Sequence, residues 1–104
     1  NLDNWIILYI FFELNLIKSL GYDVNLNQYK NITDDFLEIK KIKIDGYMYD
    51  VPCYLILKKT PNKISNNLIR KSLYFTRNII QNKFFLPNNI PFPKSRVILE
   101  NYFN

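Results

Sequence analysis

Three lysines and two tyrosines lie close together near the middle of the chain, in a pattern that could bind nucleic acid. Lys40, Lys41 and Lys43 are followed by Tyr47 and Tyr49 across an Asp-Gly pair. Ammonium groups contact phosphates and tyrosine rings stack on bases, so this mixture suits single-stranded DNA. Cross-strand tyrosines also stabilise a β-hairpin, which is the structural alternative. We therefore treat Lys40, Lys41, Lys43 and Tyr47 as candidate DNA contacts.

A second group of cations lies on one predicted helix. Arg70 and Arg77 are seven positions apart and so share a helix face, with Lys71 and Tyr74 beside them. A cationic rim next to an aromatic ring could hold an acidic peptide that ends in an aromatic residue. Basic side chains can equally form a solvated helix face with no ligand, and this alternative stays open.

The start of the last predicted helix is the third candidate site. Lys94 and Arg96 place two cations in a first turn, where the macrodipole disfavours each by roughly 0.3 kcal/mol or more. A DNA phosphate would compensate, because helix N-termini also attract anions. An internal ion pair would do the same and is the preferred interpretation. Glu13 is the expected partner of Arg96, because a carboxylate inside an apolar helix cannot be buried alone.

Several kinds of catalysis and metal binding are excluded by residue types that are missing. The chain has no histidine and a single cysteine, Cys53, which excludes a Cys/His zinc site and a Ser-His or Cys-His catalytic pair within it. With Gly21 and Gly46 as its two glycines, it has no glycine-rich phosphate loop. Asp34 and Asp35 are interpreted as a turn cap. We expect no enzymatic activity, no metal and no cofactor.

The net charge is consistent with a polyanionic partner but does not require one. A formal charge of +5 suits nucleic acid. Asn, Ile and Lys are far above ordinary usage, which is the bias that an AT-rich genome produces. This codon bias raises the number of lysines whether or not the protein has an anionic partner.

The hydrophobic pattern predicts a single, mainly α-helical domain over residues 1–104 with a small β-hairpin. The first helix runs to about Leu20 and ends at Gly21. Apolar residues occupy nearly every face near its start, so we expect it at the centre of a compact helical domain. Its most hydrophobic stretch, Trp5 to Leu14, is too short for a membrane span of about 20 residues.

The rest of the chain reads as a hairpin followed by two helices. After an extended segment over 22–31, alternating residues and the Asp-Gly pair at 45–46 predict the hairpin. Helical spacing recurs from about 66 to 81, and Pro93 suits the first position of a last helix. The apolar segment 54–57 is left without an assigned type.

Two longer motifs add a family resemblance. The stretch FFELNLIKSLGYDVNL begins at Phe11, and FPKSRVILENYF begins at Phe92. They resemble the C-terminal domain of RecO, the bacterial recombination mediator, whose helices read roughly F-E-L-x-L-L-x-x-L-G-Y and P-(L)-K-S-R-x-x-L. The matching residues are Phe12, Glu13, Leu14, Leu16, Leu20, Gly21, Tyr22, Pro93, Lys94, Ser95, Arg96 and Leu99. With VPCYLI at 51–56 resembling a Leu-Pro-x-Phe-Leu element, the resemblance covers nearly the whole chain.

The resemblance implies a non-enzymatic DNA repair module in the cytoplasm. RecO-like proteins bind DNA and the acidic tail of single-stranded-DNA-binding protein (SSB), cooperate with RecR, anneal strands and help to load RecA. Arg70, Lys71, Tyr74 and Arg77 then become candidate contacts for the SSB tail. An N-terminal OB-fold is expected upstream. Many members carry a zinc site, but Tyr29 stands near its first cysteine position, so the metal is expected to be lost.

The alternative comes from a different functional class. A helical structural or protein-interaction domain with no nucleic-acid role would fit the same composition, with its positive charge due to codon bias alone. An OB-like set of five alternating strands upstream would favour the RecO-like interpretation, and its absence would contradict it.

Overall fold

The computed structural model describes residues 2–103, with side chains from residue 5 onward. In chain order the elements are α1 (Leu2–Ser19), the 3-10 helix η1 (Leu26–Ile32), β1 (Ile39–Ile44), β2 (Tyr47–Pro52), α2 (Cys53–Leu57), α3 (Asn66–Ile80), the π-helical turn η2 (Gln81–Phe85) and α4 (Lys94–Tyr102). Over these residues the fold is mainly helical with one antiparallel hairpin, so the predicted fold class is confirmed.

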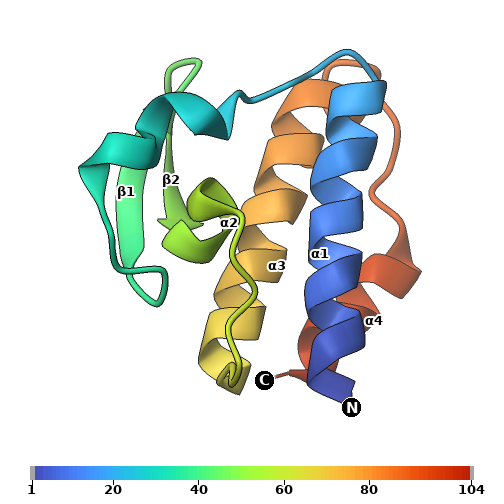
Figure 1. Ribbon diagram of the computed structural model, residues 1–104. Coiled ribbons are helices and arrows are strands. Elements are labelled where there is room, and N and C mark those ends of the chain that lie inside the picture. The colour runs from blue at the N-terminus through green and yellow to red at the C-terminus, as the bar shows by residue number, and fades with distance from the viewer. Residues whose placement is uncertain (1, 104) are drawn as a thin grey trace.

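The helix α3 is the element that joins the others, because it packs against the hairpin, α1 and α4. In Figure 1, α1 and α3 run side by side in the same direction, with the hairpin and α2 on one side and α4 on the other. Both helices contribute fully buried aliphatic side chains to the core, among them Ile6, Ile10, Ile69, Leu73 and Ile79. Each such side chain stabilises the fold by about 1.5–3 kcal/mol.

One face of α1 is exposed, which differs from the expectation of a helix packed on several sides. Leu8 is 68% exposed, and it belongs to a stripe with a spacing of three or four residues: Trp5, Leu8, Phe12, Leu16 and Leu20. The apolar composition predicted burial all round, but α2, α3 and α4 contact other faces of the helix and leave this one exposed. This stripe, the α1 stripe, is therefore an apolar surface, of the kind that can mark an interaction site.

The hairpin forms as its sequence predicts. Asp45 and Gly46 adopt φ values of 50° and 88°, which are the positive angles that a two-residue turn requires. The turn fixes a register in which Ile42 faces Tyr49 across the strands. Tyr49 is buried, with its ring edge-on to Phe75 of α3 at 6.0 Å. The hairpin is therefore held to α3 through its inner face.

The segment that the sequence left unassigned is the short helix α2, and it is almost completely buried. The Tyr54 hydroxyl donates to Ser72 Oγ at 2.7 Å, and Ser72 donates to the Leu68 carbonyl at 2.7 Å. Because both hydroxyls are paired, Tyr54 can be buried without an unsatisfied polar group. This contact fixes α2 against α3.

Helix ends follow the predicted signals, with two local differences. Gly21 adopts a φ of 93° and ends α1, and the Tyr22 amide donates to the Ile17 carbonyl at 3.1 Å. The segment expected to be extended instead contains η1, whose first residue, Leu26, is buried in the core. Pro93 caps α4 with φ −62° and ψ 130°, one position before the first helical residue. No described helix is long and apolar enough to cross a membrane.

Candidate nucleic-acid interface

Glu13 of α1 and Arg96 of α4 meet beside α3, which is the contact expected from the sequence. The Arg96 guanidinium donates from Nε to Glu13 Oε2 at 2.5 Å and from Nη2 to Oε1 at 2.9 Å. Thr76 and Tyr9 hydroxyls donate to the same carboxylate at 2.6 and 3.0 Å. Arg96 Nη2 also donates to the Leu73 carbonyl at 3.0 Å. The two side chains are 14% and 8% exposed, so the pair is buried and well bonded.

Two further charged residues extend this pair into a network. Glu100 Oε2 lies 3.8 Å from Arg96 Nη1, and its Oε1 lies 3.1 Å from Arg77 Nε. Burial raises the pKa of Glu100, although Arg77 and Arg96 act in the opposite direction. The Arg77 guanidinium also lies over the Tyr74 ring, 5.3 Å from its centroid. With two carboxylates and two guanidiniums, the network is neutral and joins α1, α3 and α4.

This network contains the internal ion pair that the sequence analysis preferred for Arg96 over a DNA contact. Its guanidinium could reach a phosphate only by leaving Glu13, and leaving a buried charge unpaired costs about 3–5 kcal/mol. Its burial and its bonds to Glu13 favour a structural role for Arg96 over a DNA contact. Lys94 is exposed, but it begins α4, which lies across α1 and α3 from the hairpin (Figure 1). The cations of the KSR motif and those of the hairpin do not share a surface.

The outer face of the hairpin carries two of the predicted DNA contacts. Lys41 lies opposite Asp50 and Lys43 lies opposite Met48. Side chains alternate between the faces of a strand, so these four side chains lie on the side that faces away from the core. Lys41 and Lys43 are both exposed. Their ammonium groups can therefore contact the same extended polyanion.

The other two predicted DNA contacts are on the opposite face of the hairpin. Lys40 lies opposite Val51, and Tyr47 lies opposite Ile44, on the side that packs against the core. Lys40 extends to the edge and pairs with Glu38 at 3.3 Å. Tyr47 remains exposed because it is next to the turn. The structure therefore divides the predicted cluster into two pairs, since consecutive strand residues alternate in direction.

A groove of about 230 Å³ lies on the surface where β2 and α3 pack against each other. From the hairpin it is lined by Lys41, Met48, Tyr49 and Asp50, and from α3 by Lys71, Tyr74, Phe75 and Asn78. The Asp50 carboxylate lies 3.9 Å from the Lys41 amine and 3.9 Å from the Lys71 amine. Two ammonium groups thus share one carboxylate, and the groove keeps a net positive charge beside a tyrosine ring.

The groove combines members of the two sets that the sequence kept apart. Lys41 comes from the predicted DNA contacts, and Lys71 and Tyr74 come from the predicted SSB contacts. Arg70 donates from Nη2 to Asn67 Oδ1 at 2.9 Å and does not line the groove. Arg77 is bound to Glu100. Of the four predicted SSB contacts, the structure therefore places two in the groove and ties two to neighbouring side chains.

Residues with metal-binding or nucleophilic chemistry are dispersed. Among the residues whose placement is described, no three His, Cys, Asp or Glu side chains gather where an ion could bind. Cys53 is buried, and desolvation raises the pKa of its thiol, which disfavours the reactive thiolate. Asp35 accepts from the Leu37 amide at 3.0 Å and so caps a turn.

Comparison with protein-family models, curated proteins and solved structures found no match for this chain.

Asp50 and Glu100 are the charged site residues that the sequence analysis missed. A signal was present for both. The two-residue turn fixes the hairpin register and places Asp50 opposite Lys41. Glu100 follows Arg96 by one helical turn. The approach of Lys71 to Asp50 had no signal in the sequence, because it depends on how α3 packs against β2.

Proposed function

We propose that this domain is a non-enzymatic, RecO-like DNA-binding module that contacts single-stranded DNA through the outer hairpin face and the adjoining groove. The observation that supports this best is the convergence of Lys41 and Lys71, from separate elements, on one groove, with Lys43 exposed on the same face of the hairpin. Codon bias accounts for many lysines in a chain, but it gives no reason for them to converge.

The two lysines of the groove can exchange their contacts with the Asp50 carboxylate for contacts with a DNA phosphate. Asp50 is about half exposed, and both of its ion pairs are long, at 3.9 Å. Exposed pairs of this kind contribute about 0–1 kcal/mol, so a phosphate can displace the carboxylate at small cost. Tyr74 at the groove offers a ring for base stacking, worth about 1–3 kcal/mol per base.

The proposal extends to the partners that the RecO resemblance implies. The acidic tail of SSB would use Lys71 and Tyr74, which lie in the groove. DNA and the SSB tail would then compete for Lys71. The RecO-like role that we propose also includes annealing of strands, cooperation with RecR, loading of RecA and a cytoplasmic location.

Backbone NMR shifts on titration with single-stranded oligothymidylate test the proposed surface. We expect the largest changes at Lys41, Lys43, Lys71 and Tyr74, and small changes on the α1 stripe. A matched pair of variants, Lys71→Gln and Lys59→Gln, provides the control, because Lys59 is also exposed and does not line the groove. Shifts that are confined to α4, or absent at saturating DNA, would contradict the proposal.

A protein-interaction domain without a nucleic-acid role is the second candidate, and the α1 stripe favours it. Exposed apolar side chains in a continuous stripe are more typical of a protein interface than of a DNA surface. Under this function, Phe12→Ser would abolish partner binding and Lys41→Gln would have no effect. The same oligothymidylate titration separates the two candidates, since this one predicts no shifts.

A further inference from the structure

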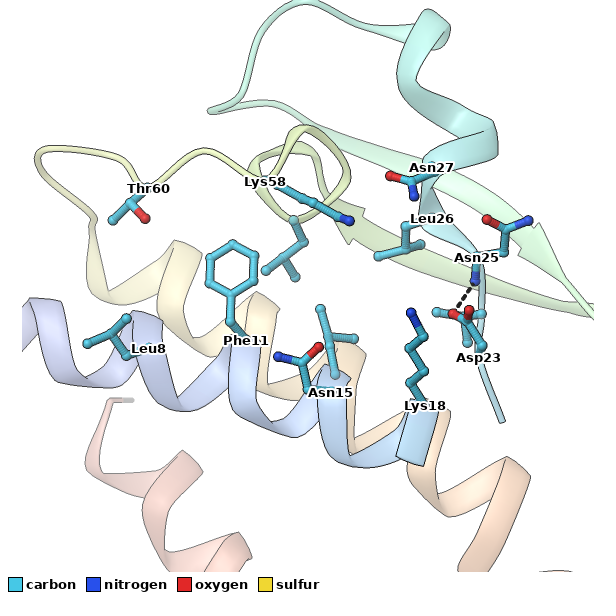
Figure 2. Close-up of a pocket in the computed structure, with 13 residues that line it drawn as sticks. Leu8, Phe11, Asn15, Lys18, Asp23, Asn25, Leu26, Asn27, Lys58 and Thr60 are labelled. Atoms are coloured by element: carbon cyan, nitrogen blue, oxygen red, sulfur yellow. Dashed lines mark hydrogen bonds between the residues drawn. The ribbon is translucent and has the colours of Figure 1, made fainter. Parts of the chain in front are cut away.

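A second, larger cleft lies on a different part of the molecule. It has a volume of about 420 Å³ and lies between α1, the segment 23–27 and the end of α2 (Figure 2). Its walls include the apolar side chains of Phe11, Leu14, Leu26 and Leu55. It shares no lining residue with the groove at β2 and α3. The volume is in the range of small-molecule sites, about 300–1,000 Å³.

Two lysines give one end of this cleft a positive charge. In Figure 2 the amines of Lys18 and Lys58 both point toward the space between α1 and Leu26. Within the described part of the chain, neither lysine takes part in an ion pair. The amide side chains of Asn25 and Asn27 line the same end and add hydrogen-bond donors.

Asp23 is the acidic residue in the lining, and it is already engaged. Its Oδ1 accepts from the Asn25 amide at 2.9 Å, which holds the turn before η1. Two ammonium groups and one carboxylate leave a net charge of one positive unit in the cleft. A ligand with a single negative charge would balance it.

The backbone fixes the position of Lys58. This residue is the C-cap of α2 in the left-handed conformation, with φ 56° and ψ 41°. Glycine or asparagine is the usual residue there, because a side chain makes this conformation unfavourable. The Lys58 amide donates a hydrogen bond to the Tyr54 carbonyl, which also holds the backbone in place at the cap. The Lys58 backbone, and with it the start of the side chain, is therefore held at the cleft by the buried helix α2.

We propose that this cleft binds a small amphipathic carboxylate. The carboxylate would lie between the Lys18 and Lys58 amines, and the apolar body would lie along Phe11, Leu14 and Leu55. An acyl chain of about ten carbons or an aromatic acid of similar size fits the volume. The proposal does not depend on DNA binding, because the two sites have no residue in common.

Paired titrations with decanoate and decanol, below their aggregation limits, test the site by NMR. The two probes share an apolar chain and differ in charge. Lys18 and Lys58 are exposed, and exposed ion pairs contribute about 0–1 kcal/mol each, so decanoate is expected to bind about three- to tenfold more tightly. The largest shifts should occur at Phe11, Leu14, Leu26 and Leu55.

Charge-removing variants identify the carboxylate position. Lys18→Gln with Lys58→Gln should lower the affinity for decanoate toward that for decanol and leave decanol binding unchanged. Lys59→Gln is the matched control, because this neighbouring lysine does not line the cleft and should have no effect. Thermal unfolding of each variant shows whether a loss of binding is only a loss of folding, and decanol binding by the double variant provides a second check.

Several results would overturn the proposal. They are the absence of saturable decanoate binding, equal affinities for decanoate and decanol, and shifts centred on Phe12 and Leu16 of the α1 stripe. A peptide with a C-terminal apolar residue and a free carboxylate should bind more weakly than decanoate. Tighter binding by that peptide would show that the site recognises a protein terminus instead.

Discussion

Removal of either member of the Glu13–Arg96 pair should strongly destabilise the domain, and by unequal amounts. Arg96→Ala leaves the Glu13 carboxylate with hydroxyl donors only, and it also removes one of the two cations near Glu100. Two buried carboxylates therefore lose a counter-charge. We expect a loss of about 5 kcal/mol in the free energy of unfolding, at the upper end of the usual range for such pairs.

Glu13→Ala should cost less, about 3 kcal/mol. The Arg96 guanidinium keeps the Leu73 carbonyl at 3.0 Å and the Thr76 hydroxyl at 3.1 Å, and Glu100 stays within 3.8 Å. The double variant removes both charges and leaves Glu100 with Arg77. It should therefore lose much less than the sum of the single variants, with a coupling energy of about 2–3 kcal/mol.

Urea unfolding followed by circular dichroism measures all three variants. Asp50→Ala is the control, because its ion pairs are exposed and should contribute less than about 1 kcal/mol. Domains of this size have stabilities of about 5–15 kcal/mol, so at the lower end of that range Arg96→Ala should be largely unfolded even without urea. Additive losses, or a larger loss for Glu13→Ala than for Arg96→Ala, would refute the reasoning.

Three further predictions concern the fold. Burial raises the pKa of Tyr54 to about 12 from 10.0, so the folded state keeps a proton that the unfolded chain releases, and stability should fall as the pH rises through this interval. Tyr54→Phe should lower the free energy of unfolding by about 1 kcal/mol near neutral pH, because it removes the hydrogen bond to Ser72. In urea unfolding, the stability of this variant should also fall less steeply at alkaline pH than that of the wild type. Parallel curves of stability against pH would contradict this prediction. Gly46→Ala should lower the stability by about 1 kcal/mol in thermal unfolding, because φ is 88° and a side chain disfavours this angle. The cost comes from the backbone alone, since no atom lies within 4 Å of the added methyl group. An unchanged stability would show that the turn relaxes. A strong chelator should leave the melting temperature unchanged, since Cys53 is the single cysteine and there is no histidine, and one equivalent of bound zinc would overturn this expectation.

The features that the sequence predicted are those set by local chemistry or by an unusual single residue. The Asp45-Gly46 turn and the Gly21 helix end follow from backbone preferences within a few residues. The long-range contact of Glu13 with Arg96 could be predicted because Glu13 lies in an apolar stretch with no cation within one helical turn. A carboxylate in an apolar helix and a guanidinium at a helix start each required a partner.

The features that the sequence did not predict depend on packing between elements. The composition of α1 shows that it is hydrophobic, but not which face α3 covers, so the exposure of Phe12 and Leu16 was not foreseen. The groove likewise requires the packing of α3 against β2, which brings Lys71 near Asp50. Strand alternation was available in the sequence and would have separated Tyr47 from Lys43.

The most direct test of the DNA-binding proposal is the salt dependence of single-stranded DNA binding, measured by fluorescence anisotropy for the wild type and for Lys41→Glu with Lys43→Glu. Each lysine that neutralises a phosphate contributes about −0.7 to the slope of log K against log salt for single strands. The double variant should bind oligonucleotides of different sequence with uniformly lower affinity and flatten the slope by about 1.4. An unchanged affinity and slope would exclude the hairpin from the binding surface and contradict the proposal.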